Sequence, residues 1–320
     1  MMWPTTNARW QAHEVPKRML KPGAVPSLNQ AKSTSTIRLA SLAVVAGGAL
    51  WGLYWVPIRM FEELGLTGVW PGLVIYVAAL AIIAPFAFAV KFPTVSKWQF
   101  AWVGLLTGAA FTFYGTAITL TDVLRALLLF YLTPVWGTAI GVMFLGERLT
   151  LARVLAILMA FGGLFAVVGC GSRSGFNLGD VLALASGIFW AIGSYKIYKV
   201  GNIPPIHLTL AFLVGSIVVT FVLLLVAGDT LGSRTEFPPI QDLWLYAVLS
   251  GLFAVPMILL TMWPASILTP GRMGILLMSE VVVGIGSVAL LAGEPFGPFE
   301  ALGAALILGA SLTEVIGNRS

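Results

Sequence analysis

A single carboxylate, Glu280, interrupts an apolar run, between Leu276–Met278 and Val281–Val283. In the middle of a membrane-spanning helix an acidic residue costs about 2.5 to 3.5 kcal/mol, so such a residue is expected to face water or protein. A carboxyl group in these surroundings can take up and release a proton, or it can balance the charge of a bound solute. The alternative is a protonated, structural glutamate that is hydrogen-bonded to a neighbouring helix.

Pro134 interrupts a second apolar run. Proline has no backbone N–H, so the carbonyl group one turn earlier, near Phe130, is expected to be free to bind a ligand. A simple packing kink is the alternative. Gly137 and Gly141 follow at a spacing that favours close packing of two helices.

Aromatic residues lie deep within several apolar runs, in addition to those at the ends. The candidates for a binding site are Trp51, Tyr54, Trp55, Tyr131, Trp190 and Tyr195. A tryptophan N–H or tyrosine O–H inside hydrocarbon needs a hydrogen-bond partner. We therefore expect these residues, with Glu280 and Pro134, to line a central substrate-binding site that suits flat, apolar or cationic solutes. Ordinary core packing is the alternative for each of them.

The composition defines what must position these side chains. Hydrophobic residues make up 58% of the 320 residues and charged residues only 10%, whereas about a quarter of the residues in soluble domains are charged. A soluble domain and a disordered chain are both excluded. One cysteine excludes a disulfide framework. The remaining class is a helical membrane protein, in which each spanning segment satisfies its own backbone hydrogen bonds.

The apolar runs predict ten transmembrane helices. Residues 1–36 form a basic, proline-containing tail, and nine short polar breaks divide the rest of the chain into ten runs. Each run is long enough for one crossing of the hydrocarbon. The fold class is therefore an all-α integral membrane protein, with a lipid bilayer as its surroundings.

The distribution of lysine and arginine predicts the orientation. Placing the tail in the cytoplasm puts 14 of these residues inside and leaves four outside, namely Arg59, Arg125, Arg173 and Arg234. Cytoplasmic flanks carry the excess of positive charge, so both termini are expected in the cytoplasm of a cell inner membrane. The net charge of +5 is expected to interact with the anionic lipids of the inner leaflet. We expect no nucleic-acid partner. On the outer side, Asp122 and Arg125 are expected to form a solvated pair of little energetic consequence.

The two halves of the chain resemble each other at an offset of 147 residues. This offset aligns Gly146-Glu147 with Gly293-Glu294, and Gly137 with Gly284. We therefore expect two repeats, over residues 37–170 and 179–317. Five spans per repeat is an odd number, so the second repeat must enter the membrane in the opposite sense, as in many secondary transporters.

Three motifs carry a family resemblance: LWG at Leu50–Gly52, TPV at Thr133–Val135 and LGERLT at Leu145–Thr150. With the ten apolar runs in two halves, they resemble the EamA-type transporters of the drug/metabolite transporter superfamily, over about residues 38–317. The resemblance implies secondary active export of small metabolites, such as amino acids or related compounds, by alternating access. Proton coupling through Glu280 would fit such an exporter.

Several classes of function are excluded or remain as alternatives. The sequence has no P-loop and no grouping of ligands for a metal or haem, so we expect no ATP-driven pump, no enzyme, no cofactor and no metal. Uptake instead of export, a pump for many cationic drugs, and a membrane-embedded sensor or enzyme remain as alternatives. The sequence leaves the substrate and the oligomeric state open.

Overall fold

The computed structural model describes residues 34–145, 151–166, 175–201, 203–231, 238–268, 273, 276–277, 279–292 and 297–317. The expected tail lies almost wholly outside these residues, as do Glu147 and Glu294 of the repeat alignment. Every regular element within the described residues is a helix. These are α1 (Thr34–Trp51), α2 (Trp55–Glu63), α3 (Trp70–Ala89), α4 (Lys97–Leu120), α5 (Val123–Phe130), α6 (Thr133–Leu145), α7 (Leu151–Phe165), α8 (Leu178–Val200), α9 (Pro205–Ala227), α10 (Ile240–Ala265), α12 (Ser279–Ser287), the π-helix η2 (Val288–Ala292) and α13 (Pro298–Gly317).

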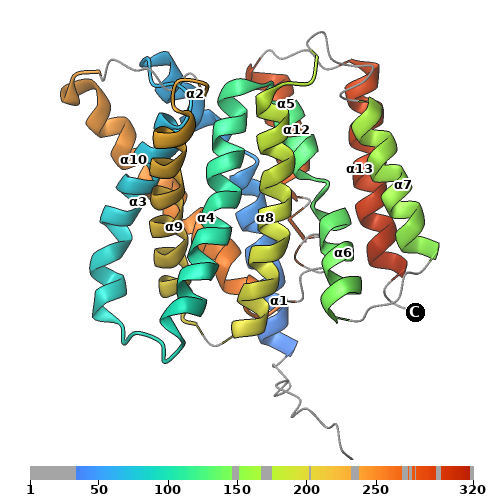
Figure 1. Ribbon diagram of the computed structural model, residues 1–320, viewed down its shortest axis with the longest axis horizontal. Coiled ribbons are helices and arrows are strands. Elements are labelled where there is room, and N and C mark those ends of the chain that lie inside the picture. The colour runs from blue at the N-terminus through green and yellow to red at the C-terminus, as the bar shows by residue number, and fades with distance from the viewer. Residues whose placement is uncertain are drawn as a thin grey trace, which may run out of the picture.

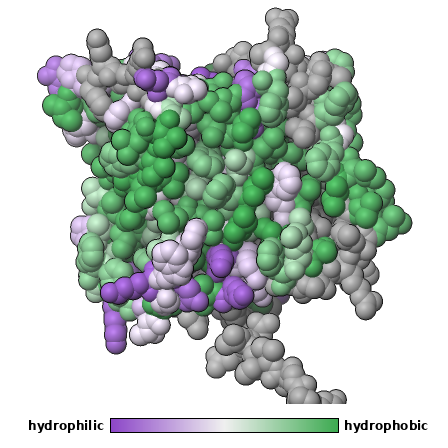
Figure 2. Space-filling view, in the orientation of Figure 1, coloured by the Kyte–Doolittle hydropathy of each residue, from purple (hydrophilic) through white to green (hydrophobic). Residues whose placement is uncertain are grey.

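Seven helical segments of the described chain are long and apolar enough to cross a membrane, by length and composition. They are Ser35–Glu63, Trp70–Ala89, Lys97–Leu120, Val123–Phe144, Leu178–Val200, Pro205–Ala227 and Ile240–Ala265. Shorter apolar helices cover Val154–Gly163, Ser279–Leu291 and Ala301–Ala310. Apolar residues fill the middle of the visible face, and hydrophilic residues gather toward its upper and lower edges (Figure 2). The chain is therefore an all-helical, multi-pass membrane protein.

The segments run in alternating directions across the molecule (Figure 1). Helix α1 begins, and α13 ends, toward the lower side of this view. Helix α4 packs against α8 and α9, while α10 packs against α1 and α3. Helices α7 and α13 pack against each other at one end of the molecule. The first and second halves are thus interleaved, and the centre is built from both.

Small residues allow the closest of these contacts. A Cβ atom on Gly108 of α4 would collide with the backbone of Gly215 and Ser216 on α9, so only glycine fits at this crossing. Gly137 behaves differently, since a Cβ there would meet no described atom within 4 Å. The expectation of close packing at Gly137 is therefore wrong.

Candidate functional site

The first span is broken near its middle. Helix α1 ends at Trp51, α2 begins at Trp55, and Gly52 to Tyr54 form a turn between them. At this break the backbone lies against α12, because a Cβ on Gly52 would lie 2.6 Å from the Glu280 carbonyl oxygen and 2.8 Å from the Gly284 nitrogen. Real Cβ atoms essentially never come that close. Glycine at position 52 therefore brings the break in the first span next to Glu280.

The fourth span is broken as well, but the Phe130 carbonyl group at this break already has a hydrogen-bond partner. Helix α5 ends at Phe130 and α6 begins at Thr133, so Pro134 lies in the first turn of α6, where its missing N–H costs little. The Thr133 hydroxyl donates to the Phe130 carbonyl oxygen over 2.5 Å. The expectation that this carbonyl is free for a ligand is therefore wrong. The Pro134 side chain lies outside what the structure describes.

Glu280 lies in the first turn of α12 and is only 1% exposed. Protein therefore surrounds the carboxyl group, and lipid does not. Its Oε2 atom is 3.0 Å from the Tyr131 hydroxyl, which follows directly after α5. The hydroxyl of Tyr114 on α4 also interacts with this carboxyl group. The Oε1 atom is buried and has no hydrogen-bond partner among the described residues.

The hydroxyl of Tyr131 has a second acceptor, the carbonyl oxygen of Leu277. A phenol has one proton to donate, so it cannot supply both hydrogen bonds at once. Both bonds form only if Glu280 is protonated, because its own O–H can then donate to the phenol oxygen while the phenol donates to Leu277. The geometry thus matches a proton-carrying form of Glu280.

Aromatic rings from several helices join at this site into one cluster, which we call the aromatic cluster. Its members are Trp51, Tyr54, Phe111, Tyr114, Phe130, Tyr131 and Trp190. Trp51 stacks on Phe111 with ring centres 4.0 Å apart, and Trp190 meets Phe111 edge-on at 5.1 Å. The ring of Phe130 packs against those of Tyr114 and Tyr131, and the Tyr131 hydroxyl contacts Glu280.

The polar atoms of Trp51, Tyr54, Trp55 and Tyr131 have hydrogen-bond partners, as the chemistry of buried tryptophan and tyrosine requires. Trp51 Nε1 donates to Thr261 and Trp55 Nε1 to Ser287, both over 3.0 Å. The Tyr54 hydroxyl donates to that of Tyr76 over 3.0 Å. These bonds hold the rings in place from α3, α10 and α12.

The structure brings most of the expected site residues together, with one exception. Trp51, Tyr54, Tyr131 and Trp190 belong to the aromatic cluster, and Trp55 packs nearby on α12 through Ser287. Tyr195 lies elsewhere: its ring is 6.2 Å from that of Phe144, and the Lys199 ammonium is 5.8 Å from its centre.

Phe111 and Tyr114 are central to the site without having been expected there. Both lie in the segment TGAAFTFYGTA, from Thr107 to Ala117. So many small residues allow neighbours to approach on every side of a helix, which is a signal for a central position. That signal is present in the sequence, and it favours a central position for this segment; Phe111 and Tyr114 are buried, while Phe113 is partly buried.

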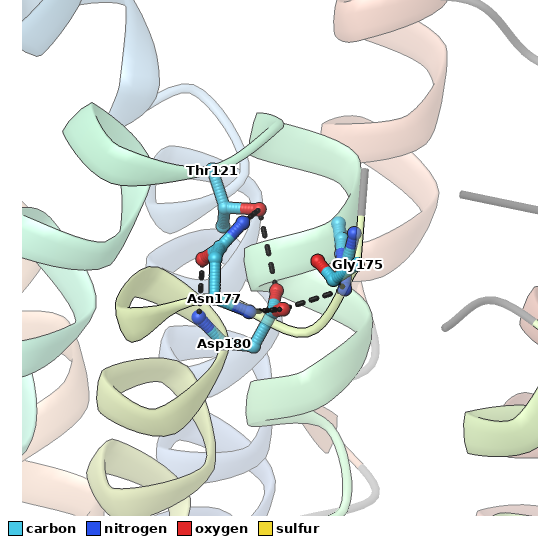
Figure 3. A network of polar contacts seen from close by, with 5 residues as sticks. Thr121, Gly175, Asn177 and Asp180 are labelled. Atoms are coloured by element: carbon cyan, nitrogen blue, oxygen red, sulfur yellow. Dashed lines mark hydrogen bonds and ion pairs between the residues drawn. The ribbon is translucent and has the colours of Figure 1, made fainter. Parts of the chain in front are cut away.

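A second polar network lies where α5 and α8 begin (Figure 3). Arg125 and Asp180 form an ion pair in which both side chains are buried. Asp180 also accepts from Thr121 over 3.2 Å and from the Asn177 backbone over 2.8 Å, and Asn177 caps α8 in return. The expected solvated pair of Arg125 with Asp122 is wrong, because Arg125 is buried against Asp180.

No group of three or more His, Cys, Asp or Glu that could hold a metal ion occurs among the described residues. The buried Asp, Glu, Lys and Arg side chains of this part of the chain are Arg125, Asp180 and Glu280. Because the first two pair with each other, Glu280 is the one of these three without a counter-ion among the described residues.

Comparison with known proteins gives a family and a fold. A model described as the EamA-like transporter family matches residues 38–169. A solved structure titled only "Crystal structure of protein" is similar with a TM-score of 0.60 at 19% identity, covering 90% of this chain and 99% of its own. At that identity the likeness concerns the fold alone. No curated protein matches.

Proposed function

Over residues 38–169 this chain belongs to the EamA-like transporter family, a membrane transporter family of the drug/metabolite transporter superfamily, and from this premise we propose that it is a proton-coupled secondary exporter of small metabolites. Amino acids or related compounds are the substrate class that the resemblance implies. Transport takes place by alternating access in a cell inner membrane. Direction in such a carrier follows the gradients that act on it.

The proposal includes ten spans in two inverted repeats of five. The seven long segments and the three shorter apolar helices add to ten, and they coincide with the ten apolar runs of the sequence. An even number of crossings returns the chain to its starting side, which fits the positions of α1 and α13 at the lower side of Figure 1. The excess of lysine and arginine then places both termini in the cytoplasm.

Helix packing supports the inverted repeat. Exchange of the two repeats maps α1 to α8, α3 to α9, α4 to α10, α5 with α6 to α12, and α7 to α13. The pair α4 with α8 then becomes α10 with α1, and α4 with α9 becomes α10 with α3; all four pairs occur. The pairs α3 with α9 and α7 with α13 map onto themselves. Helices α4 and α10 also run in opposite directions (Figure 1).

The observation that carries the transport proposal is the place of Glu280. It is a buried carboxyl group without a counter-ion in the described part of the chain, and it lies where the breaks of the first and fourth spans approach the start of α12. Broken helices and ionisable groups inside a membrane protein are typical of substrate and ion pathways, because unwound backbone and buried charge are otherwise costly there. With Glu280 only 1% exposed, the conformation described here is closed around this group.

The chain's own groups suffice for the proton step. When Glu280 is protonated, Tyr131 donates to Leu277 and joins the fourth span to the ninth. Loss of the proton turns the carboxyl group into an acceptor, so Tyr131 then donates to Glu280 and releases the Leu277 carbonyl oxygen. Protonation thereby changes which group of the ninth span the Tyr131 hydroxyl binds. Contacts between packed helices are of the kind that changes when the halves move.

Flux measurements on purified protein in lipid vesicles test the proposal. Wild-type protein is expected to exchange at least one labelled solute from a panel of amino acids, amines and nucleosides, and a proton gradient is expected to drive its accumulation. In Glu280→Gln the gradient-driven accumulation should fall to background. Glu63→Gln is the matched control, because it makes the same change at an exposed position. Absence of exchange for the whole panel, or undiminished gradient-driven flux in Glu280→Gln, would overturn the proposal.

A further inference from the structure

The described residues at the centre of the protein include a buried acidic group, Glu280, but no basic group that pairs with it. Among the described residues the buried cation is Arg125, and the ion pair with Asp180 already engages it. Glu280 therefore has no cationic side chain among the described residues to balance it when it is ionised. An unbalanced buried carboxylate is strongly unfavourable, so a proton or a bound cation must neutralise it.

The two oxygens of the carboxyl group differ in their hydrogen bonds: the Tyr131 and Tyr114 hydroxyls interact with the carboxyl group, but neither forms a hydrogen bond to Oε1. Tyr131 contacts Oε2, whereas Oε1 is buried without a hydrogen-bond partner. A buried acceptor without a hydrogen bond is unfavourable, and buried acceptors of this kind are rare in folded proteins. A donor brought by a ligand would satisfy Oε1 and neutralise the charge in a single contact.

The groups around the carboxylate restrict what that ligand is. Besides Glu280, the titratable groups at this point are the phenols of Tyr131 and Tyr114, while α1 presents the backbone of Gly52. Both phenols belong to the aromatic cluster, and the ring of Phe130 packs against each of them. Aromatic faces attract organic ammonium ions, and the attraction is strongest where water is excluded. A bare metal ion instead requires a shell of several oxygen ligands.

Resting on the transporter proposal, we propose that the substrate is an organic ammonium ion whose N–H group binds Oε1 of Glu280 while its apolar part lies against the aromatic cluster. One ammonium ion replaces one proton on Glu280, and that proton leaves to the solvent. Substrate and proton exclude each other, so exchange is one for one and the carboxyl group is never left unbalanced. A free amino acid fits less well, because its own carboxylate would lie beside Glu280 with no described cation to receive it.

Four ligands that share one ring separate these possibilities: phenethylamine, its neutral analogue phenethyl alcohol, zwitterionic phenylalanine and anionic hydrocinnamate. Binding is measured by calorimetry on wild-type protein in lipid nanodiscs over a pH series. Phenethylamine is expected to bind most tightly. On the acid side its apparent Kd should weaken by about tenfold per pH unit, because one proton competes with it. Binding of phenethyl alcohol should not follow this slope.

Two variants test whether the pH dependence of phenethylamine binding arises from Glu280. Glu280→Gln should weaken phenethylamine binding by about tenfold or more and remove its pH dependence, since a charge pair is lost. Glu63→Gln should change neither. The comparison of the four ligands on the wild-type protein stays valid even if Glu280→Gln is poorly folded.

Several results would overturn the inference. Phenylalanine binding as tightly as phenethylamine, equal amine binding by Glu280→Gln, or competition by sodium ions at comparable concentration each contradicts it. If phenylalanine exchanges in vesicles while phenethylamine neither binds nor exchanges, the ammonium inference fails and the transporter proposal survives. If no solute exchanges at all, the transporter proposal itself fails.

Discussion

Arg125 and Asp180 form a buried ion pair that joins the first turn of α5 to the first turn of α8 (Figure 3). Their side chains are 4% and 0% exposed. Helix α5 is only eight residues long, and all eight are buried. The ion pair holds one end of this helix, and Tyr131 at the other end contacts Glu280. The short helix therefore connects the site to a fixed point near the end of the bundle.

Removing one member of this pair should destabilise the protein strongly. Asp180→Asn leaves the Arg125 charge buried and uncompensated, which costs about 3 to 5 kcal/mol, and thermal unfolding in detergent measures the loss. The double variant Arg125→Met with Asp180→Leu is expected to be more stable than Asp180→Asn. Glu62→Gln is the control, because its ion pair with Arg59 is partly exposed and should contribute about 1 kcal/mol or less. Equal unfolding temperatures for Asp180→Asn and Glu62→Gln would show that the Arg125 pair has no special weight.

Tyr131→Phe should separate the proton step from binding. The variant keeps the ring of the aromatic cluster but removes the hydroxyl, so Glu280 Oε2 and the Leu277 carbonyl oxygen each lose a contact. A loss of about 1 to 3 kcal/mol in stability follows if these acceptors stay buried. The pH profile of gradient-driven flux should shift, while solute exchange without a gradient persists. An unchanged pH profile would remove Tyr131 from the proton step.

Gly52→Ala should damage both stability and transport. The added Cβ would meet the Glu280 carbonyl oxygen at 2.6 Å, so α1 and α12 must move apart, at a cost of about 1 to 3 kcal/mol. Gly137→Ala makes the same substitution where no described atom lies within 4 Å. That control should be neutral or stabilising by up to about 1 kcal/mol, because alanine favours a helix. If both variants behave alike in unfolding and flux, the close crossing at Gly52 is not what supports the site.

Labelling of single cysteines tests the orientation. In a Cys170→Ser background, Thr94→Cys lies between the second and third spans and Glu63→Cys lies at the end of the first, both at exposed positions. A membrane-impermeant maleimide added to intact cells should label position 63 and spare position 94. Labelling of inverted vesicles should give the opposite result. The reverse pattern would place both termini outside and contradict the charge argument.

The helices and the burial of Glu280 within protein could be predicted from local sequence. Apolar runs of spanning length can satisfy their backbone only as helices, and a carboxyl group within such a run must avoid lipid; neither statement needs a partner residue. The break near Pro134 is local for the same reason. Whether the Phe130 carbonyl oxygen is free depends on the rotamer of Thr133, whose hydroxyl donates to it. The position of the proline does not reveal that rotamer.

Pairing between distant residues could be decided only by the tertiary structure. Arg125 has Asp122 three residues away, yet it binds Asp180, because folding brings the start of α8 to the start of α5 and buries both charges there. Tyr114 reaches Glu280 only because α4 lies at the centre of the bundle. Tyr195 lies apart from the aromatic cluster, toward the end of α8, where its ring is near the Phe144 ring and the Lys199 ammonium. The hydropathy and charge of each segment are properties of the sequence itself, so the helices and their orientation can be predicted from it. Which polar atoms meet depends on how the helices cross, and that is set by the packing of all of them together.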